Sequence, residues 1–187
     1  MCLILSQYCL VSLKVTSSYR LIERVCKNYP KAFKVVIGDA LYLNEKIFKL
    51  LDAHHKKTIA VLKEERRQLF EEANKLSLLS KPKIYQDKKT TYRVWDHTIS
   101  GCWDGYDKNV RVIVSEETTT KRVHAKDGKG WEQKSQVSNW MWVTNLLDDS
   151  MGDLKNTVRI CHSRWQIENK CFRRNSKYLE GRSYLQA

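Results

Sequence analysis

The sequence has few of the residues that mark fibrous, low-complexity or linker-like chains. Its 187 residues include only 7 glycines and 2 prolines, which excludes collagen-like repeats and Gly/Pro-rich linkers. Apolar residues make up 42% and aromatic residues 10% of the chain, and these fractions exclude an intrinsically disordered protein. The length and the apolar fraction are sufficient to bury the core of one domain.

The sequence also lacks the cysteine spacings of a metal site and the long apolar run of a membrane span. None of the six cysteines forms a CxxC pair, so we interpret them as free thiols buried in a cytosolic protein. Residues 2–13 are apolar, but they lack a basic leader and are too short to cross a bilayer. We predict one or two buried strands there.

Acidic residues are scarce relative to basic ones. The chain has 21 acidic and 34 basic residues, giving a formal net charge of +13. Such an excess favours a polyanionic partner, most often a nucleic acid, although it is also compatible with a merely solvated surface. Basic residues outnumber acidic ones in residues 151–187, which can be a solvated helix face or a track for the DNA backbone.

Residues 16–77 alternate between helical and strand-like patterns. A helical pattern ends at Tyr29-Pro30, and two β-branched runs, residues 33–37 and 58–62, predict core strands. Asn44 is the expected N-cap of the helix between them, and residues 66–77 predict a third helix. This alternation is typical of an α/β layer with parallel strands.

After Pro82 the pattern changes to strands separated by turns. The expected strands are residues 91–99, 110–118, 121–125 and 137–144. Turn signals at Asp104-Gly105 and Asp127-Gly128 favour an antiparallel arrangement. A long final helix is expected to begin at Asp153 and to continue through Glu168 to Phe172.

These patterns predict an α/β fold with a mixed sheet and flanking helices, interrupted by a β-rich insertion before the final long helix. We expect three parts. Residues 1–80 form the first part of the core, residues 81–136 the insertion, and residues 137–187 a return strand and the C-terminal helix.

Two carboxylates are candidates for chemistry. Asp39 follows a buried strand, where a charge is costly unless it is paired or bound to a metal ion. Glu168 lies on the expected final helix, four residues after Arg164, so the two share a helix face. The structural alternatives are a turn-capping role for Asp39 and a surface ion pair between Arg164 and Glu168.

Both segments resemble the same family. Residues 35–42 read VVIGDALY and resemble the second catalytic aspartate segment of DDE transposases, the closest group being the cut-and-paste transposases of bacterial insertion sequences. Residues 164–169 read RWQIEN and resemble the segment around that family's catalytic glutamate. In its Tyr-x2-Arg-x3-Glu-x6-Lys signature, Arg164 and Glu168 match, whereas Cys161 and Asn175 replace the tyrosine and the lysine.

The resemblance implies an RNase H-like catalytic domain that cleaves and joins DNA. In the family, carboxylates hold two Mg²⁺ ions, for which Mn²⁺ can substitute, so Asp39 and Glu168 would be catalytic metal ligands. The implied partners are double-stranded DNA at transposon ends and targets, and a second copy in a homodimer on paired ends. We expect a cytoplasmic, nucleoid-associated bacterial protein. The implied DNA contacts are Arg164, Arg174, Lys177, Lys63 and Arg66.

The family's first catalytic aspartate has no counterpart here. Glu23 is the only acidic residue before Asp39, and its place in a helical pattern predicts a solvated side chain. We therefore expect the chain to begin after the strand that carries the first aspartate, and to be unable to cleave or join DNA alone. The alternatives are a non-catalytic DNA-binding remnant or regulator of a full-length transposase, and an unrelated basic α/β protein.

Three tryptophans fall in or beside the expected insertion, namely Trp95, Trp103 and Trp131. An exposed indole at such a place can stack on an unpaired base at a transposon end, as in related transposases. The alternative, which we favour, is packing within the core or a hairpin.

Overall fold

The structure is a computed structural model. It describes residues 2–4, 11–64, 67–101, 103–124, 130–147 and 153–164. Its first part consists of parallel strands flanked by helices. The chain divides into two compact units. The first unit consists of Met1–Ala60 together with Asp148–Ala187, and the second consists of Val61–Leu147.

The first unit contains three parallel strands in the order β1-β2-β3. The strands are β1 (Cys2–Ile4), β2 (Val35–Gly38) and β3 (Lys57–Val61), and the helices are α1 (Val11–Asn28), α2 (Glu45–Ala53) and α4 (Leu154–His162). Asn44 caps α2, since its side chain accepts a hydrogen bond from Lys46 N at 2.9 Å. The α/β class predicted from the alternating pattern is confirmed.

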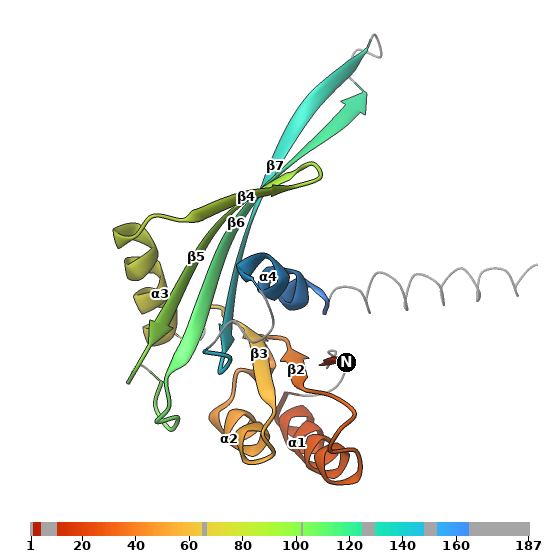
Figure 1. Cartoon of the computed structure of the whole chain (residues 1–187), viewed down its shortest axis with the longest axis vertical. Coiled ribbons are helices and arrows are strands. Elements are labelled where there is room, and N and C mark those ends of the chain that lie inside the picture. Colours follow the sequence, from red (N-terminus) through yellow and green to blue (C-terminus); the bar gives the residue numbers. More distant parts are fainter. Residues whose placement is uncertain are drawn as a thin grey trace, which may run out of the picture. The chain divides into compact units, whose positions relative to one another are not determined.

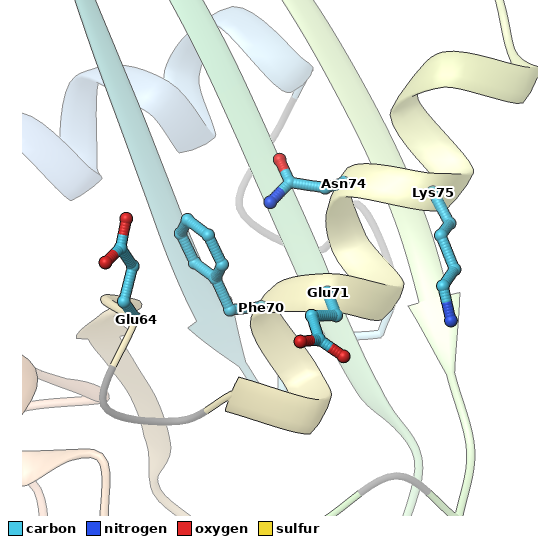
Figure 2. Close-up of a pocket in the computed structure, with 5 residues that line it drawn as sticks. All are labelled: Glu64, Phe70, Glu71, Asn74 and Lys75. Atoms are coloured by element: carbon cyan, nitrogen blue, oxygen red, sulfur yellow. The ribbon is translucent and has the colours of Figure 1, made fainter.

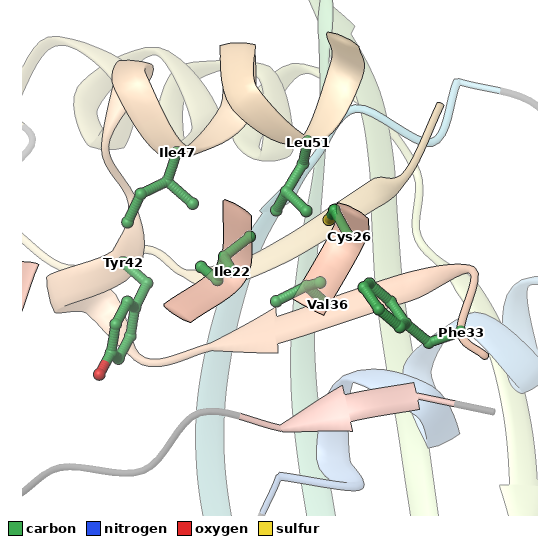
Figure 3. Packing of buried hydrophobic residues seen from close by; sticks show 7 residues of the cluster. All are labelled: Ile22, Cys26, Phe33, Val36, Tyr42, Ile47 and Leu51. Carbon is green, nitrogen blue, oxygen red and sulfur yellow. The ribbon is translucent and has the colours of Figure 1, made fainter. Parts of the chain in front are cut away.

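The core of this unit forms where α1 and α2 pack on β2, as Figure 3 shows. Its buried side chains are Ile22, Cys26, Phe33, Val36, Tyr42, Ile47 and Leu51. Because side chains alternate along a strand, Val35 and Ile37 face away from Val36, and both are also buried. Coverage of both faces is typical of a parallel strand and explains the uninterrupted apolar run of β2.

The second unit contains α3 (Arg67–Leu79) and an antiparallel sheet in the order β7-β6-β5-β4. The strands are β4 (Lys83–Asp87), β5 (Thr90–Ile99), β6 (Val110–His124) and β7 (Trp131–Thr144). Pairing between β5 and β6 ends at Thr90 and Thr119, whereas β6 and β7 stay paired to His124 and Trp131. Residues 120–124 and 131–135 therefore continue beyond β5 as a two-stranded ribbon (Figure 1).

Several boundaries differ from those predicted. The strands expected at residues 110–118 and 121–125 are one strand, β6, because Thr119 and Thr120 are good strand formers and no turn residue separates them. The boundary expected after residue 136 falls inside β7, and β4 was not predicted. Both missed segments are largely exposed, so they lack the apolar alternation that identifies a half-buried strand.

Both ends of the first unit also differ from expectation. Helix α1 begins at Val11, so residues 11–13 are helical rather than strand, an ambiguity inherent in short apolar runs. Helix α4 ends at His162, where Ser163 N donates to Ile160 O at 2.9 Å and tightens the last turn. Arg164 therefore lies in a turn after the last residue of α4. The expected continuation to Phe172 lies outside the described residues.

Candidate functional site

Asp39 lies directly after β2, as the sequence predicted, and only 6% of the residue's surface is exposed. Its backbone is extended, and its Oδ1 accepts a hydrogen bond from Ala40 N at 2.8 Å. That bond caps η1 (Ala40–Tyr42), a single turn of 3₁₀ helix. The capping role considered as an alternative is therefore present, and it uses one of the two carboxylate oxygens.

Close packing between Gly38 and Tyr42 fixes the backbone around Asp39. A Cβ atom on Gly38 would lie 2.5 Å from Tyr42 Cβ, closer than real side chains approach. Tyr42 N donates to Asp39 O at 2.8 Å, and Ser18 Oγ on α1 donates to the Tyr42 hydroxyl at 3.3 Å. The strand end, η1 and α1 thus hold Asp39 in one conformation.

The alternation along β2 gives the direction of the Asp39 side chain. Val36 faces the core under α1 and α2, so the extended continuation of the strand places Asp39 on the opposite face, with Ile37. Helix α4 lies on that side of β2, away from α1 (Figures 1 and 3). Asp39 therefore points away from the apolar core of α1 and α2 and towards the side occupied by α4.

The other predicted site residues are only partly described. Asp153 begins α4 as predicted, since its side chain accepts from Asn156 N at 2.9 Å. Arg164 follows this helix and is buried, with 6% of its surface exposed. Lys63 follows β3 and is exposed. The remaining predicted residues, Glu168, Arg174, Lys177 and Arg66, lie outside the described residues, so the expected meeting of Asp39 with Glu168 stays a prediction.

The side chains near Asp39 determine whether the described residues could bind the expected Mg²⁺ ions. A carboxylate is the kind of hard oxygen ligand that Mg²⁺ prefers, and a buried one is stabilised by a cation. Within the described ranges, however, no three His, Cys, Asp or Glu side chains come together. The described residues thus hold one of the two predicted ligands, which fits Mg²⁺ in kind but does not by itself form a metal site.

A hollow of about 560 Å³ beside α3 was not anticipated from the sequence. It is lined by Glu64, Phe70, Glu71, Asn74 and Lys75. Figure 2 shows the Phe70 ring between the Glu64 carboxylate and the Asn74 amide, while Glu71 points elsewhere. The polar groups of these five described residues do not converge on one point, so together they form no metal or anion site.

The three tryptophans of the insertion have different environments. Trp103 is buried, with its ring 5.2 Å from that of Tyr106, and Trp95 Nε1 donates to Ser80 O at 3.1 Å. The interpretation that these tryptophans pack within the protein is therefore correct for Trp95 and Trp103. Trp131, at the start of β7, is 63% exposed and is the one that keeps a surface indole.

Comparisons with known proteins add no family assignment. A scan of the chain against protein-family models gives no match, and a search of curated proteins gives none either. Among the described helices, none combines the length and apolar character needed to cross a membrane.

Proposed function

We propose that this chain is part of the catalytic core of a DDE transposase that binds transposon-end DNA, with Asp39 as a carboxylate of its metal site. The observation that carries the proposal is the position of Asp39, which is a buried carboxylate at the carboxyl end of a buried parallel strand. Ligand sites in parallel α/β sheets lie at this end of the strands.

Two further features support the proposal. A buried carboxylate is stabilised by a cation, and the cap of η1 uses only Oδ1 of Asp39. Arg164, the residue that the resemblance assigns to a phosphate, belongs to the same compact unit. In the proposed reaction, Asp39 would therefore contribute a rigidly held carboxylate, and Arg164 would contribute a positively charged side chain for a DNA phosphate.

The test measures Mn²⁺ binding by electron paramagnetic resonance, in the absence of DNA and without reference to activity. We expect Asp39→Asn and Glu168→Gln each to weaken Mn²⁺ binding at least tenfold relative to the native chain, because each removes one charged oxygen ligand. Asp107→Asn is the matched control, since Asp107 is an exposed loop carboxylate.

Native-like Mn²⁺ binding by Asp39→Asn would overturn the assignment of this residue. Duplex DNA binding that persists in a chain with no Asp39-dependent Mn²⁺ binding would instead favour a DNA-binding remnant or regulator without catalysis.

A further inference from the structure

A polar hollow of about 450 Å³ lies where the turn between β4 and β5 meets the β6–β7 ribbon. Three basic side chains line it, from Lys88, Lys89 and Arg122. The rest of the lining has hydroxyl or amide side chains, from Thr91, Thr120, Gln86 and Gln133. No acidic side chain is found among the described residues that line the hollow, so its lining consists of cations and neutral hydrogen-bonding groups.

Strand alternation separates this basic hollow from the acids nearby. Register places Gln133 opposite Arg122, so both lie on one face of the ribbon. Asp87, Glu117 and Glu132 occupy the alternate positions and face the other way. Burial and the carboxylates of Glu117 and Asp87 raise the pKa of Tyr92, which agrees with their gathering on that opposite face.

The remaining nearby acid is neutralised. Glu116 lies on the same face as Arg122, but its Oε1 accepts a hydrogen bond from Arg93 Nη1 at 2.7 Å. The cations of the hollow therefore face no unpaired carboxylate on their own surface among the described residues. A net positive, acid-free concavity of this kind is complementary to phosphate.

Hydrogen bonds join the end of the turn between β4 and β5 to β6. Lys89 O accepts from Thr120 N at 3.0 Å, and the hydroxyls of Thr90 and Thr119 are 2.9 Å apart. Lys88 has a φ of 55°, in the left-handed region where glycine or asparagine is usual in a two-residue turn. A lysine here costs roughly 1 kcal/mol of backbone strain, so its presence favours a role for its charge.

We propose that Lys88, Lys89 and Arg122 form a binding site for the phosphate backbone of double-stranded DNA. The ribbon that carries Arg122 has the form that the DNA major groove admits, two antiparallel strands, and the lysines at its base are placed to meet the flanking phosphates. The identification of the polyanion as DNA rests on the proposed function. The site belongs to the second unit, whereas Asp39 belongs to the first.

The experiment measures binding of a short fluorescein-labelled duplex of random sequence by fluorescence anisotropy, over a series of salt concentrations. The variant is Lys88→Gln/Lys89→Gln/Arg122→Gln in the full chain. Its control is Lys31→Gln/Lys49→Gln/Arg24→Gln, which removes the same charge from exposed positions of the first unit. Circular dichroism checks that both remain folded.

We expect the hollow variant to bind more weakly and its slope of log affinity against log salt to fall by about 1 per lost contact, about 3 in all. The control should keep nearly the native slope. Equal weakening of both variants, or none in the hollow variant, overturns the site. Binding of the native chain to anionic vesicles, without binding to duplex DNA, would also overturn the proposed site. Loss of DNA binding in the hollow variant, with Mn²⁺ binding independent of Asp39, would uphold this site while refuting the proposed catalytic function.

Discussion

Gly38 is the residue on which the geometry of Asp39 most depends. Its φ does not require glycine, but Tyr42 packs so closely that no side chain fits between them. Gly38 and Asp39, which follow the predicted strand, thus have different roles. Gly38 leaves room for the Tyr42 side chain, and Asp39 presents its carboxylate.

We expect Gly38→Ala to lower the free energy of unfolding by about 2 kcal/mol, because Tyr42 must shift to accept the methyl group. The same shift should weaken Mn²⁺ binding through Asp39. Urea titration measures the first effect. Gly130→Ala is the control, since a Cβ there meets no atom within 4 Å and should change stability by less than about 0.5 kcal/mol. Equal stability of the two variants would show that the Tyr42 contact is not a constraint.

The sequence predicted the position of Asp39 after a buried strand but not the basic hollow, because the two depend on different kinds of information. Asp39 ends an uninterrupted β-branched run, so its place after a buried strand follows from neighbouring residues. Lys88, Arg122 and Gln133 come from separate strands and meet only through register. Since β4 is exposed and was not recognised, the turn carrying Lys88 was not recognised either.

At the scale of elements, the end of α2 shows how backbone hydrogen bonds close a helix. His54 is the C-cap, and His55 takes a left-handed φ of 55°. His55 N donates to Asp52 O at 2.9 Å and Lys56 N donates to Leu51 O at 2.8 Å. This pair of bonds is the Schellman arrangement, in which the left-handed residue is usually glycine.

We expect His55→Gly to raise the free energy of unfolding by about 1 kcal/mol, because glycine adopts this φ without the steric cost that a side chain carries. His54→Gly is the matched control. His54 has a φ of −97°, so glycine gains nothing there and should lower stability by about 0.5 to 1 kcal/mol. Thermal unfolding followed by circular dichroism distinguishes the two, and a loss of stability in His55→Gly would contradict the expected relief of strain.

Element types were more predictable than element boundaries. The buried strands β2 and β3 were located from their apolar runs, since burial dictates their composition. The exposed part of β7 is stabilised instead by its pairing with β6, a non-local interaction that leaves little apolar signal in the sequence.

At the scale of the whole molecule, the net charge of +13 predicted a polyanionic partner without giving its location. Charge patterning in sequence is one-dimensional, whereas a sheet sorts residues by face. Asp87 and Lys88 are neighbours in the chain, yet only Lys88 lines the hollow. Locating the basic hollow therefore requires the register, and the DNA contacts implied by the resemblance to transposases are other residues than those that line it.

Among the described residues, each unit contains a buried group whose titration couples stability to pH. Burial raises the pKa of the Cys26 thiol above its ordinary value despite the opposing effect of the Lys56 ammonium, and burial with nearby carboxylates raises the pKa of Tyr92. Both groups are neutral when protonated, so the folded chain holds these protons more tightly than the unfolded chain does. Their contribution to stability is complete below the unfolded pKa values, about 8.5 and 10, and is lost as pH rises through the folded values.

We therefore expect the free energy of unfolding to fall as pH is raised above about 8.5, measured by urea titration at a series of alkaline pH values. Cys26→Ala should remove the earlier part of this fall. Tyr92→Phe should remove the later part, because it keeps the ring stacked 4.8 Å from Tyr85 but has no hydroxyl to ionise. A pH slope in Cys26→Ala identical to that of the native chain would show that the buried thiol does not contribute, since the variant lacks the only titrating atom at that position.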